Sequence, residues 1–298
     1  MTVVFHFDGT EQLQTKLPAG VFLCPESDEQ AFTRLLPEME VLWHVLKPVT
    51  GEVIARAPKL RLIQKIGSGV NTIDIEAARK RGIAVCNLPG TNSRAVAEMT
   101  LLLMLACLRR VMDLHSSVRR ARWADAWKLQ DRFGELGGRT VGLLGYGEVP
   151  KILAPMLEAM GARVQYWSRS RQSADLETVV VTSDILSLHL PLSAQTQRIL
   201  DPRRMKRGAI LVNTARGGLV DELGLLEALR DGHLSAAGLD VFATEPVDRN
   251  HPLVGMDNVV LSPHLAWLTQ ETLERSIAAA LENVRRLREG RELLHRVV

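Results

Sequence analysis

Three polar residues in the second half of the chain have the side chains that reduction of a ketone requires. Arg216 in "NTARGGLVD" offers a planar guanidinium that can bind a carboxylate and polarise a carbonyl. His264 in "LSPHLAW" can protonate an alkoxide near neutral pH, and Glu245 in "GLDVFATEP" can keep that imidazole charged. Singly, each has an ordinary alternative: a surface ion pair, a turn residue or a loop cap. Together they predict hydride transfer to a 2-keto acid.

Each of these residues follows a short segment that reads as a β-strand. After Gly138 six such segments alternate with stretches of helix length: "TVGLLGY", "RVQYWS", "ILSLHL", "AILVNTA", "AAGLDV" and "VVLSPH". This alternation predicts a parallel, doubly wound sheet, in which ligands bind at the carboxyl ends of the strands. Residues far apart in the chain can therefore converge at one edge.

The first part of the chain repeats this α/β pattern. Its strand candidates are "VVFHF" near Val3, "VLWHV" near Val41, "LRLIQKIG" near Leu60 and "IAVCN" ending at Asn87. A length of 298 residues suits two domains of ordinary size. We therefore predict an α/β protein with two lobes, each built on a parallel sheet.

Two helices are predicted outside these sheets. The segment "AVAEMTLLLMLACLRRVMDLHSSVRRARWADAW" is interpreted as one long helix that joins the two domains. The segment from Thr269 to about Arg288 is predicted as an amphipathic helix. Since no strand follows it, we expect this last helix to pack back on the first domain.

The turn "GYGEVP" follows a predicted strand and precedes a predicted helix. Gly145 and Gly147 would let the backbone approach a pyrophosphate, with the amides of Glu148 and Val149 as the main donors. A third glycine is expected where Pro150 stands, and proline disfavours helical dihedrals in the residue before it. We predict a dinucleotide-binding turn whose helix begins at or just after Pro150. The Glu148 carboxylate must either turn away from the phosphates or weaken their binding.

The end of the next strand predicts which dinucleotide is bound. An NAD-binding site usually has a carboxylate there, whereas this chain has Ser168, Arg169, Ser170 and Arg171. Hydroxyls and guanidiniums can bind a 2′-phosphate, so NADP(H) is predicted over NAD(H), with NAD(H) as the second choice. The alternative is that both arginines simply face solvent.

Composition excludes several other classes of protein. A formal charge of +3 without blocks of like charge gives no reason to expect nucleic acid or a membrane surface as partner. Three widely spaced cysteines indicate reduced thiols in the cytoplasm, and no metal-ligand spacing occurs. The longest apolar run, residues 101–108, is too short to span a bilayer. His189 in "SLHLP" has no partner motif and is interpreted as structural.

Over nearly its whole length the chain resembles the D-isomer-specific 2-hydroxyacid dehydrogenases. The matching motifs are "IGSGVNTIDIEAARKRGIAVCNLPGTNSRAVAE", "LGGRTVGLLGYG", "SDILSLHLPLSAQT", "NTARGGLVDE", "AAGLDVFATEP" and "SPHLAW". The resemblance implies two similar lobes with the cofactor lobe inserted into the substrate lobe. The expected domains are then 1–97 plus 266–298 for the substrate and 98–265 for the dinucleotide.

The same resemblance implies roles for individual residues. Arg216 would anchor the substrate, Glu245 would partner the histidine, and His264 would donate the proton in reduction and lie beside the cofactor. Formate-type relatives carry Gln where Glu245 stands, which makes them poor alternatives. The remaining implied contacts are the amides of Ser68, Gly69 and Val70 for the substrate carboxylate, Asp240 for the nicotinamide carboxamide, Leu190, Pro191 and Thr196 for the adenosine side, and Thr214 and Ala215 for the nicotinamide cleft.

Within the family, "SPHLAW" and the paired tryptophans of "RWADAW" resemble glyoxylate and hydroxypyruvate reductases, which are usually homodimers. In those relatives a tryptophan from this stretch reaches the neighbouring subunit's active site, and Trp127 is the better candidate by position. Equally, Trp123 and Trp127 could cover a dimer helix. A second class of function is a cofactor-sensing binding protein, since the same fold serves as a transcriptional corepressor.

Overall fold

The structure, a computed structural model, describes residues 1–169 and 173–298 and divides them into two compact units. Unit 1 comprises residues 1–92 and 269–298, and unit 2 comprises residues 93–268. These limits lie 5 and 3 residues from the expected domain boundaries at 97/98 and 265/266.

Unit 1 is built on a parallel sheet of five strands in the order β2-β1-β3-β4-β5. The strands are β1 Val3–His6, β2 Val21–Cys24, β3 Val41–His44, β4 Leu62–Lys65 and β5 Ala84–Cys86. Four of them match the prediction, while β2, with the sequence "VFLC", was not predicted. The predicted parallel α/β architecture is confirmed.

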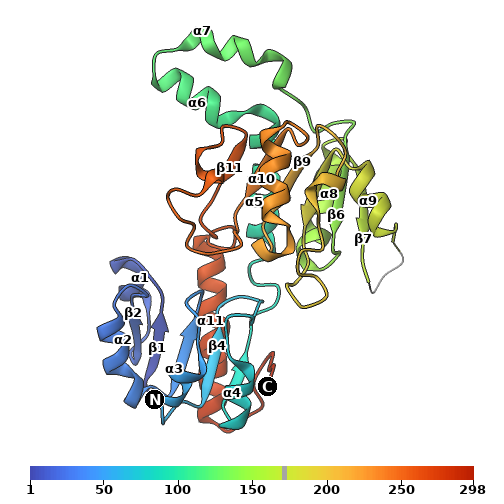
Figure 1. Cartoon of the computed structure of the whole chain (residues 1–298). Coiled ribbons are helices and arrows are strands. Elements are labelled where there is room, and N and C mark those ends of the chain that lie inside the picture. Colours follow the sequence, from blue (N-terminus) through green and yellow to red (C-terminus); the bar gives the residue numbers. More distant parts are fainter. Residues whose placement is uncertain (170–172) are drawn as a thin grey trace. The chain divides into compact units, whose positions relative to one another are not determined.

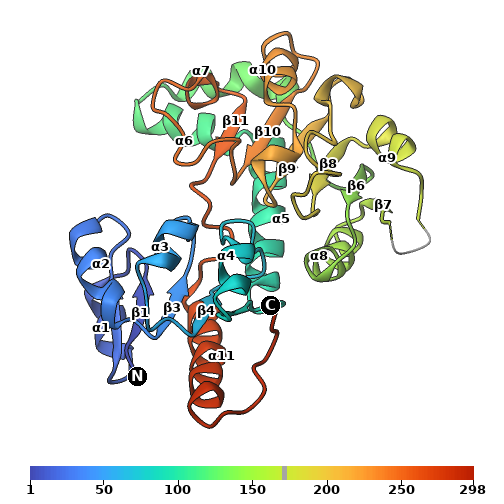
Figure 2. The same ribbon diagram turned by 60° about the horizontal axis from the view of Figure 1, so that its bottom comes forward.

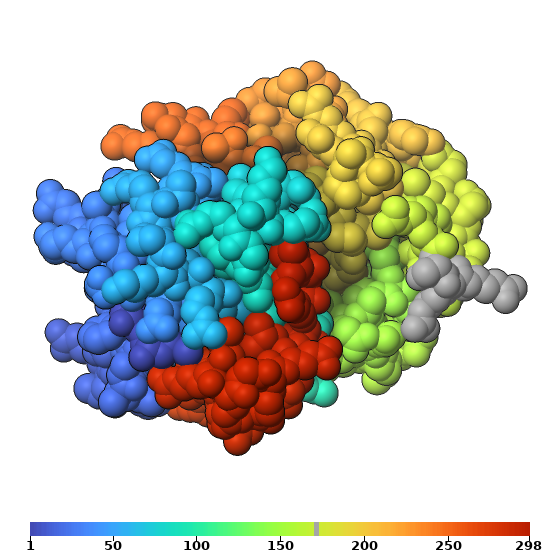
Figure 3. All heavy atoms as spheres, turned by 90° about the horizontal axis from the view of Figure 1, so that it is seen from below, coloured from blue at the N-terminus to red at the C-terminus, as the bar shows by residue number. Residues whose placement is uncertain are grey.

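Helices cover this sheet, and the end of the chain lies beside its last strand. They are α1 Glu11–Lys16, α2 Glu29–Leu35, α3 Gly51–Ala55, α4 Ile75–Lys80 and α11 Gln270–Arg288, with a 3-10 turn at Leu36–Glu38. Asn283 on α11 donates to Gln64 of β4 at 2.7 Å, and Val298 lies beside β5 through the Val85 N–H. Figure 3 shows the red C-terminal spheres beside the dark blue N-terminal ones. The last helix thus packs back on the first unit, as predicted.

Unit 2 contains a parallel sheet of six strands in the order β11-β10-β9-β8-β6-β7. Figure 2 shows these strands next to one another in this order. The strands are β6 Thr140–Leu144, β7 Arg163–Trp167, β8 Ile185–Leu188, β9 Ile210–Asn213, β10 Ala236–Leu239 and β11 Val259–Leu261. All six coincide with the predicted segments. The chain order reverses between β6 and β8, which is the switch point where ligands bind in doubly wound sheets.

Apolar residues fill both faces of this second sheet. The helices are α5 Ser93–Arg109, α6 Val111–Arg119, α7 Trp123–Ala126, α8 Glu148–Ala159, α9 Leu176–Thr182 and α10 Glu222–Arg230, with 3-10 turns at Trp127–Arg132, Pro202–Arg204, Gly217–Leu219 and Pro252–Gly255. One core cluster includes Leu103 of α5 and Leu153 of α8, and the other includes Leu225 of α10. Because a hydrophobic core lies on each face of the sheet, the side chains on both faces of its strands are apolar.

The predicted long joining helix is wrong, because the segment is broken into three helices. The break lies at Arg110, which adopts a left-handed conformation (φ 51°) and pairs with Asp113 at 2.7 Å. Ala121, also left-handed (φ 54°), separates α6 from α7. Figure 1 shows α6 and α7 projecting from the body of unit 2, and we call residues 111–132 the arm. A continuous helix would have carried this arm straight on from α5.

The predicted start of the helix after the glycine turn is also wrong. Helix α8 begins at Glu148 with Gly147 as its N-cap, so Val149 and Pro150 lie within its first turn. The first intrahelical hydrogen bond runs from the Lys151 N–H to the Gly147 oxygen, one residue beyond the proline. Because first-turn N–H groups have no intrahelical acceptor, the missing N–H of Pro150 costs the helix nothing there. This outweighs the restriction on the preceding residue.

Candidate functional site

The carboxyl ends of the six strands of unit 2 lie in register and carry the predicted site residues. Leu144 of β6 pairs with Leu188, and Asn213 of β9 pairs with Leu188 and Leu239. The residues that follow these strands are Gly145 after β6, Ser168 after β7, Leu190 after β8, Thr214 to Arg216 after β9, Asp240 after β10 and His264 after β11. The register thus brings residues from distant parts of the sequence to one edge of the sheet.

His264 and Glu245 form a hydrogen-bonded pair. His264 Nδ1 lies 2.7 Å from Glu245 Oε2, while Glu245 Oε1 accepts a hydrogen bond from the Phe242 N–H at 3.0 Å. Burial raises the pKa of Glu245, but the hydrogen bond and charge of His264, the Phe242 N–H and the Arg216 charge outweigh it, so the pKa lies below its usual value. Glu245 is therefore a carboxylate that favours a charged imidazole.

Arg216 carries the second charge that acts on Glu245. Burial lowers the pKa of Arg216, and the charge of Glu245 opposes that shift. Its Nη1 donates to the Ala215 oxygen at 2.6 Å, which bends the guanidinium back over its own turn. A partly desolvated guanidinium is a strong binder of carboxylates, because fewer waters compete for its donors. The structure thus brings all three predicted catalytic residues to the carboxyl edge of the unit 2 sheet.

The turn that bears Arg216 is held by Asn213, which sequence reasoning did not single out. Asn213 Oδ1 accepts from the Ala215 N–H at 3.0 Å, and its Nδ2 donates to the Arg216 oxygen at 2.9 Å. A side chain at Gly217 would place its Cβ 1.9 Å from the Phe242 carbonyl carbon. Because the backbones touch here, the Arg216 turn and the Glu245 turn cannot move independently. The signal was present in "NTARG" as an amide at the end of a strand.

Asp240 fixes the turn that bears His264. Its carboxylate is fully buried and accepts from the N–H groups of Leu265 at 3.0 Å and Ala266 at 2.9 Å, while its backbone oxygen accepts from the His264 N–H at 2.7 Å. Burial raises the pKa of Asp240, opposed by these hydrogen bonds and one from Ser262. His264 adopts a left-handed conformation (φ 57°), uncommon outside glycine, which this clamp maintains.

The glycine turn after β6 has the shape that a pyrophosphate requires. Gly145 has φ 101°, and a Cβ there would lie 2.5 Å from the His189 oxygen, so only glycine fits. Gly147 has no neighbour within 4 Å of its Cβ direction, which leaves the approach to the first turn of α8 open. Between them, Tyr146 stacks on Tyr166 of β7 with ring centroids 3.9 Å apart. These residues fit a dinucleotide phosphate at a helix N-terminus.

Comparison with known proteins identifies the family. A model described as "D-isomer specific 2-hydroxyacid dehydrogenase, NAD binding domain" matches residues 101–266, more than half of the chain. The chain belongs to this family. A glyoxylate reductase of Aeropyrum pernix is 40% identical over 260 residues, which cover 80% of this chain and 77% of that protein. A D-3-phosphoglycerate dehydrogenase of Mycobacterium leprae is 38% identical over 80% of this chain and 47% of its own length.

Solved structures agree. The crystal structure of the TT0316 protein from Thermus thermophilus superposes with a TM-score of 0.88 at 36% identity and covers all of both chains. This dehydrogenase is therefore an oxidoreductase of 2-hydroxy acids that uses a nicotinamide dinucleotide, and its two Rossmann-like lobes are those of the family. When bound, the reduced nicotinamide supplies a hydride to the substrate carbonyl carbon.

The Glu148 carboxylate of this dehydrogenase is paired within its own helix turn. Lys151 Nζ lies 2.5 Å from Glu148 Oε1, three residues further along α8. This ion pair partly neutralises a carboxylate placed beside the proposed phosphate site. The prediction that Glu148 turns away from the phosphates is consistent with a side chain directed at Lys151.

Further along the same edge lie the residues expected around the adenosine. The Ser168 N–H donates to Ser173 Oγ at 3.1 Å, while Arg169 is exposed. Ser170 and Arg171 lie outside the described residues. Thr196 is buried and donates to the Pro191 oxygen at 2.6 Å, so its observed contact holds the loop after Leu190. Their contacts with cofactor stay predictions.

Two threonines and a histidine below this edge have structural contacts. Thr214 Oγ1 lies 2.9 Å from Thr100 Oγ1 of α5, which ties the β9 turn to that helix. His189 Nε2 lies 3.0 Å from Ser187 Oγ, and burial lowers the pKa of His189 to about 3. A histidine held neutral in this way suits the structural role expected for it.

In unit 1, the loop after β4 contains the residues expected at the substrate carboxylate. Asn87 Nδ2 donates to the Ser68 oxygen at 2.8 Å, and the Leu88 N–H donates to the Gly67 oxygen at 2.8 Å. Within the described residues, the N–H groups of Ser68, Gly69 and Val70 donate no hydrogen bond. Three successive amides are thus available to an anion.

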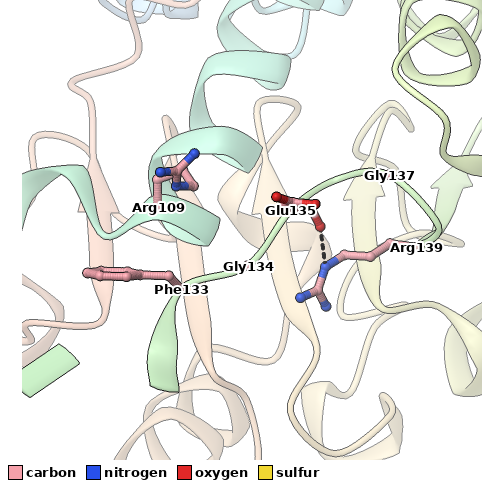
Figure 4. A pocket seen from close by; sticks show the side chains of 6 residues that line it. All are labelled: Arg109, Phe133, Gly134, Glu135, Gly137 and Arg139. Carbon is pink, nitrogen blue, oxygen red and sulfur yellow. Dashed lines mark hydrogen bonds between the residues drawn. The ribbon is translucent and has the colours of Figure 1, made fainter. Parts of the chain in front are cut away.

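Two cavities of unit 2 lie at the opposite edge of its sheet. One, of about 520 Å³, is lined by Arg109, Phe133, Gly134, Glu135, Gly137 and Arg139 (Figure 4). Arg139 Nε donates to the Glu135 oxygen at 2.6 Å, just before β6 begins. A second, of about 690 Å³, shares Phe133, Gly134 and Arg139 with it and extends to the amino ends of β9 and β10. Neither contains a predicted site residue.

The described residues offer neither a metal site nor a membrane span. Over residues 1–169 and 173–298, no group of three or more His, Cys, Asp or Glu side chains is arranged to hold a metal ion. Within the same ranges, no helix combines the length and apolar character needed to cross a membrane. Cys24, Cys86 and Cys107 are free and buried.

Proposed function

We propose that this dehydrogenase reduces glyoxylate and hydroxypyruvate to 2-hydroxy acids with NADPH. The observation that carries the proposal is the hydrogen bond of 2.7 Å between His264 and Glu245 beside a partly desolvated Arg216. The glyoxylate reductase of Aeropyrum pernix, 40% identical, supports the choice of substrate.

In the proposed reaction His264 is the proton donor. Its Nδ1 is engaged by Glu245, so Nε2 delivers the proton to the developing alkoxide. Ionised Glu245 stabilises the imidazolium before the transfer and holds the ring in one orientation. Arg216 binds the substrate carboxylate and polarises the ketone oxygen. These roles follow from the charges of the three side chains and from their position at the carboxyl edge of the unit 2 sheet.

The substrate carboxylate would also be bound by unit 1. The amides of Ser68, Gly69 and Val70 are proposed as its donors, because they lie in a loop opened by Gly67 (φ 140°) and have no acceptor among the described residues. Asp240, Thr214 and Ala215 are proposed to line the nicotinamide side, and Leu190, Pro191 and Thr196 the adenosine side.

NADPH is preferred over NADH because no carboxylate follows β7. Ser168 and exposed Arg169 offer a hydroxyl and a guanidinium to a 2′-phosphate, together with Ser170 of the neighbouring sequence. The test is Arg169→Ala, which should raise the KM for NADPH about tenfold and leave that for NADH unchanged, as loss of one charge-assisted contact predicts. Equal effects on both cofactors would contradict the assignment.

A homodimer formed through the arm is the proposed assembly. Helices α6 and α7 and the following turn contain no buried residue, and Trp123 and Trp127 are each 69% exposed. Helices this short are unstable without packing, so a second copy of the chain is the proposed cover. Trp127 is assigned to the partner's site or to the interface itself. The buried reduced cysteines favour a cytoplasmic enzyme.

The deciding experiment is turnover by the purified protein with NADPH and a panel of 2-keto acids. Glyoxylate and hydroxypyruvate should oxidise the cofactor, and bulkier acids less. His264→Ala should lose most turnover, at least about 100-fold, as expected for a general acid, while NADPH still binds. His233→Ala, a histidine of unit 2 outside the site that contacts the Met205 oxygen, is the control and should keep wild-type turnover. No turnover with any acid would refute the proposal.

A further inference from the structure

A carboxylate outside the proposed site holds the turn that carries Glu245. Glu222 is the first residue of α10, and its Oε2 accepts a hydrogen bond from the Ala243 N–H at 3.2 Å. The preceding N–H, that of Phe242, donates to Glu245 Oε1 at 3.0 Å. Two successive amides of one turn therefore donate to two carboxylates, one within the turn and one on a separate helix.

His251 fixes the other oxygen of Glu222. His251 Nε2 lies 3.2 Å from Glu222 Oε1, and His251 Nδ1 accepts from the Leu253 N–H at 3.3 Å. Because Nδ1 accepts, Nε2 carries the hydrogen and donates it to Glu222, so the neutral imidazole makes both contacts. The side chains of Glu222 and His251 are 28% and 22% exposed. Glu222 is thus an oriented acceptor and not a mobile surface group.

A close backbone contact also constrains the 242–245 turn. The Phe242 backbone lies against Gly217, the residue after Arg216, where a Cβ would come within 2.0 Å of the Phe242 oxygen. Gly217 restrains one side of the turn, and Glu222 is the polar contact that restrains the next residue. Loss of the Glu222 carboxylate would leave the Ala243 N–H without this acceptor. The turn would then be restrained by its backbone contact with Gly217 but no longer by a polar contact at Ala243.

We propose that Glu222, oriented by His251, is a positioning residue for the proposed catalytic pair: it holds the 242–245 turn so that Glu245 meets His264 Nδ1. The inference rests on the proposed function for its catalytic meaning. Glu222 touches neither member of the pair and acts through the Ala243 amide. The other charged groups that face the pair are Asp240, beneath the His264 turn, and Arg216, whose charge acts on Glu245.

The test compares Glu222→Ala and Glu222→Gln with Glu227→Ala. Glu227 lies on the same helix, and its ion pair with Arg203 at 3.6 Å is on the surface, so its variant is the matched control. Two quantities are measured: kcat/KM for glyoxylate with NADPH as a function of pH, and the NMR titration of the His264 ring in the protein without cofactor. Thermal unfolding of each variant records any loss of stability.

Glu222→Ala should move both the alkaline fall of activity and the ring titration to lower pH by about 0.5–1 unit, because a displaced carboxylate favours the imidazolium less. We expect kcat to fall about tenfold with little change in KM, since the proton donor is misplaced and the substrate contacts remain. Glu222→Gln, which keeps one acceptor oxygen, should shift both less, and Glu227→Ala should shift neither.

If Glu222→Ala unfolds more easily but its ring titration and pH profile match those of the wild type, the residue is only structural and the proposal is wrong. Should Glu222→Ala fail to fold, Glu222→Gln and His251→Phe take its place, and wild-type titrations in both would overturn the proposal equally. Absence of turnover in the wild type would refute the proposed function alone, because the ring titration still measures the Glu222 effect.

Discussion

His264 contacts Glu245 through only one of its two ring nitrogens. Nδ1 lies 2.7 Å from Glu245 Oε2, while Nε2 makes no hydrogen bond within the described part of the chain. The left-handed backbone of His264, clamped by Asp240, fixes the direction from which the ring meets its partner. The pair is therefore preorganised, with one nitrogen engaged by Glu245 and the other available for the proposed proton transfer.

Replacing Glu245 with Gln should separate the effect of the side chain's shape on activity from the effect of its charge. The amide keeps the length of the side chain and can still accept a hydrogen bond, but it no longer stabilises the imidazolium. Since the proposed reduction uses the protonated ring, activity should fall at lower pH than in the wild type, by about 1 unit or more. The measurement is kcat/KM for glyoxylate with NADPH across the neutral range, from mildly acidic to mildly alkaline buffer.

The control is Asp248→Asn in the same loop, whose exposed carboxylate accepts from the Asn250 N–H at 2.7 Å. It should leave the pH profile unchanged. A Glu245→Gln profile that overlays the wild type would show that this carboxylate does not govern the proton donor.

Gly217 and Gly218 provide a matched pair of substitutions. A Cβ on Gly217 would lie 1.9 Å from the Phe242 carbonyl carbon, which is backbone, whereas one on Gly218 would lie 3.2 Å from Leu192 Cδ2, which can move. Gly217→Ala should destabilise the fold by about 1–3 kcal/mol, as expected for overpacking. Because a displacement of about 1 Å at a catalytic turn can cost about 100-fold, its kcat/KM should fall by that order.

Gly218→Ala should keep its thermal stability, and its kcat/KM should stay within about threefold of the wild type, because a leucine methyl can rotate away. Urea unfolding and glyoxylate kinetics of both variants are the measurements. Equal behaviour of the two alanines would contradict the close approach of the Arg216 and Glu245 turns.

The Glu148–Lys151 pair should control cofactor affinity more than stability. Both side chains are exposed, so the pair contributes little to folding. Lys151→Ala would remove the lysine charge that opposes the Glu148 carboxylate at the N-terminus of α8, where the phosphate is proposed to bind, and should weaken NADPH binding about fivefold at low salt. Fluorescence titration with NADPH measures this effect.

A double-mutant cycle supplies the control for this pair. Glu148→Gln should bind NADPH at least as tightly as the wild type, and Glu148→Gln with Lys151→Ala should recover most of the affinity lost by Lys151→Ala alone. If the double variant binds as weakly as Lys151→Ala, the lysine contacts the cofactor itself and does not act by neutralising Glu148.

Much of the fold was predictable because strand segments and their alternation with helices are local patterns. All six strands of unit 2 lie where "TVGLLGY" to "VVLSPH" predicted them, and the candidate residues follow directly after them. Since parallel strands align their carboxyl ends, order along the chain was enough to bring Arg216 and His264 to one edge. The contact between Glu245 and His264 follows from that alignment and from the turns.

What the sequence missed depends on contacts between distant segments. The break of the joining helix at Arg110 has no proline or glycine to signal it, and the start of α8 depended on which of two opposing effects of Pro150 prevails. The clamping roles of Asp240 and Glu222 are also invisible locally, because each acts on backbone amides of another segment. Such residues are found only when the partner segments are known.

His6 should make unit 1 sensitive to acid. Its ring stacks on Phe32 with centroids 3.9 Å apart, it is 3% exposed, and its Nε2 has no hydrogen-bond partner in the described residues. Burial, then the charge of Lys47, lower the pKa of His6 from 6.5 to about 4, opposed by Asp8. In the unfolded chain the ring takes up its proton near pH 6.5, so acid favours unfolding. The contribution of the neutral His6 ring to stability is complete above pH 6.5 and is lost as the pH falls towards 4.

His6→Phe keeps the aromatic ring and removes this titration. Between about pH 7.5 and about pH 4.5 the variant should lose about 2 kcal/mol less free energy of unfolding than the wild type, as the linkage between a lowered pKa and stability predicts. The measurement is the free energy of unfolding in urea at both pH values, followed by a signal that reports on unit 1. His115→Gln, at an exposed position of the arm, should lose as much as the wild type. If His6→Phe and the wild type lose equal stability, His6 is protonated in the folded protein and its burial does not limit acid stability.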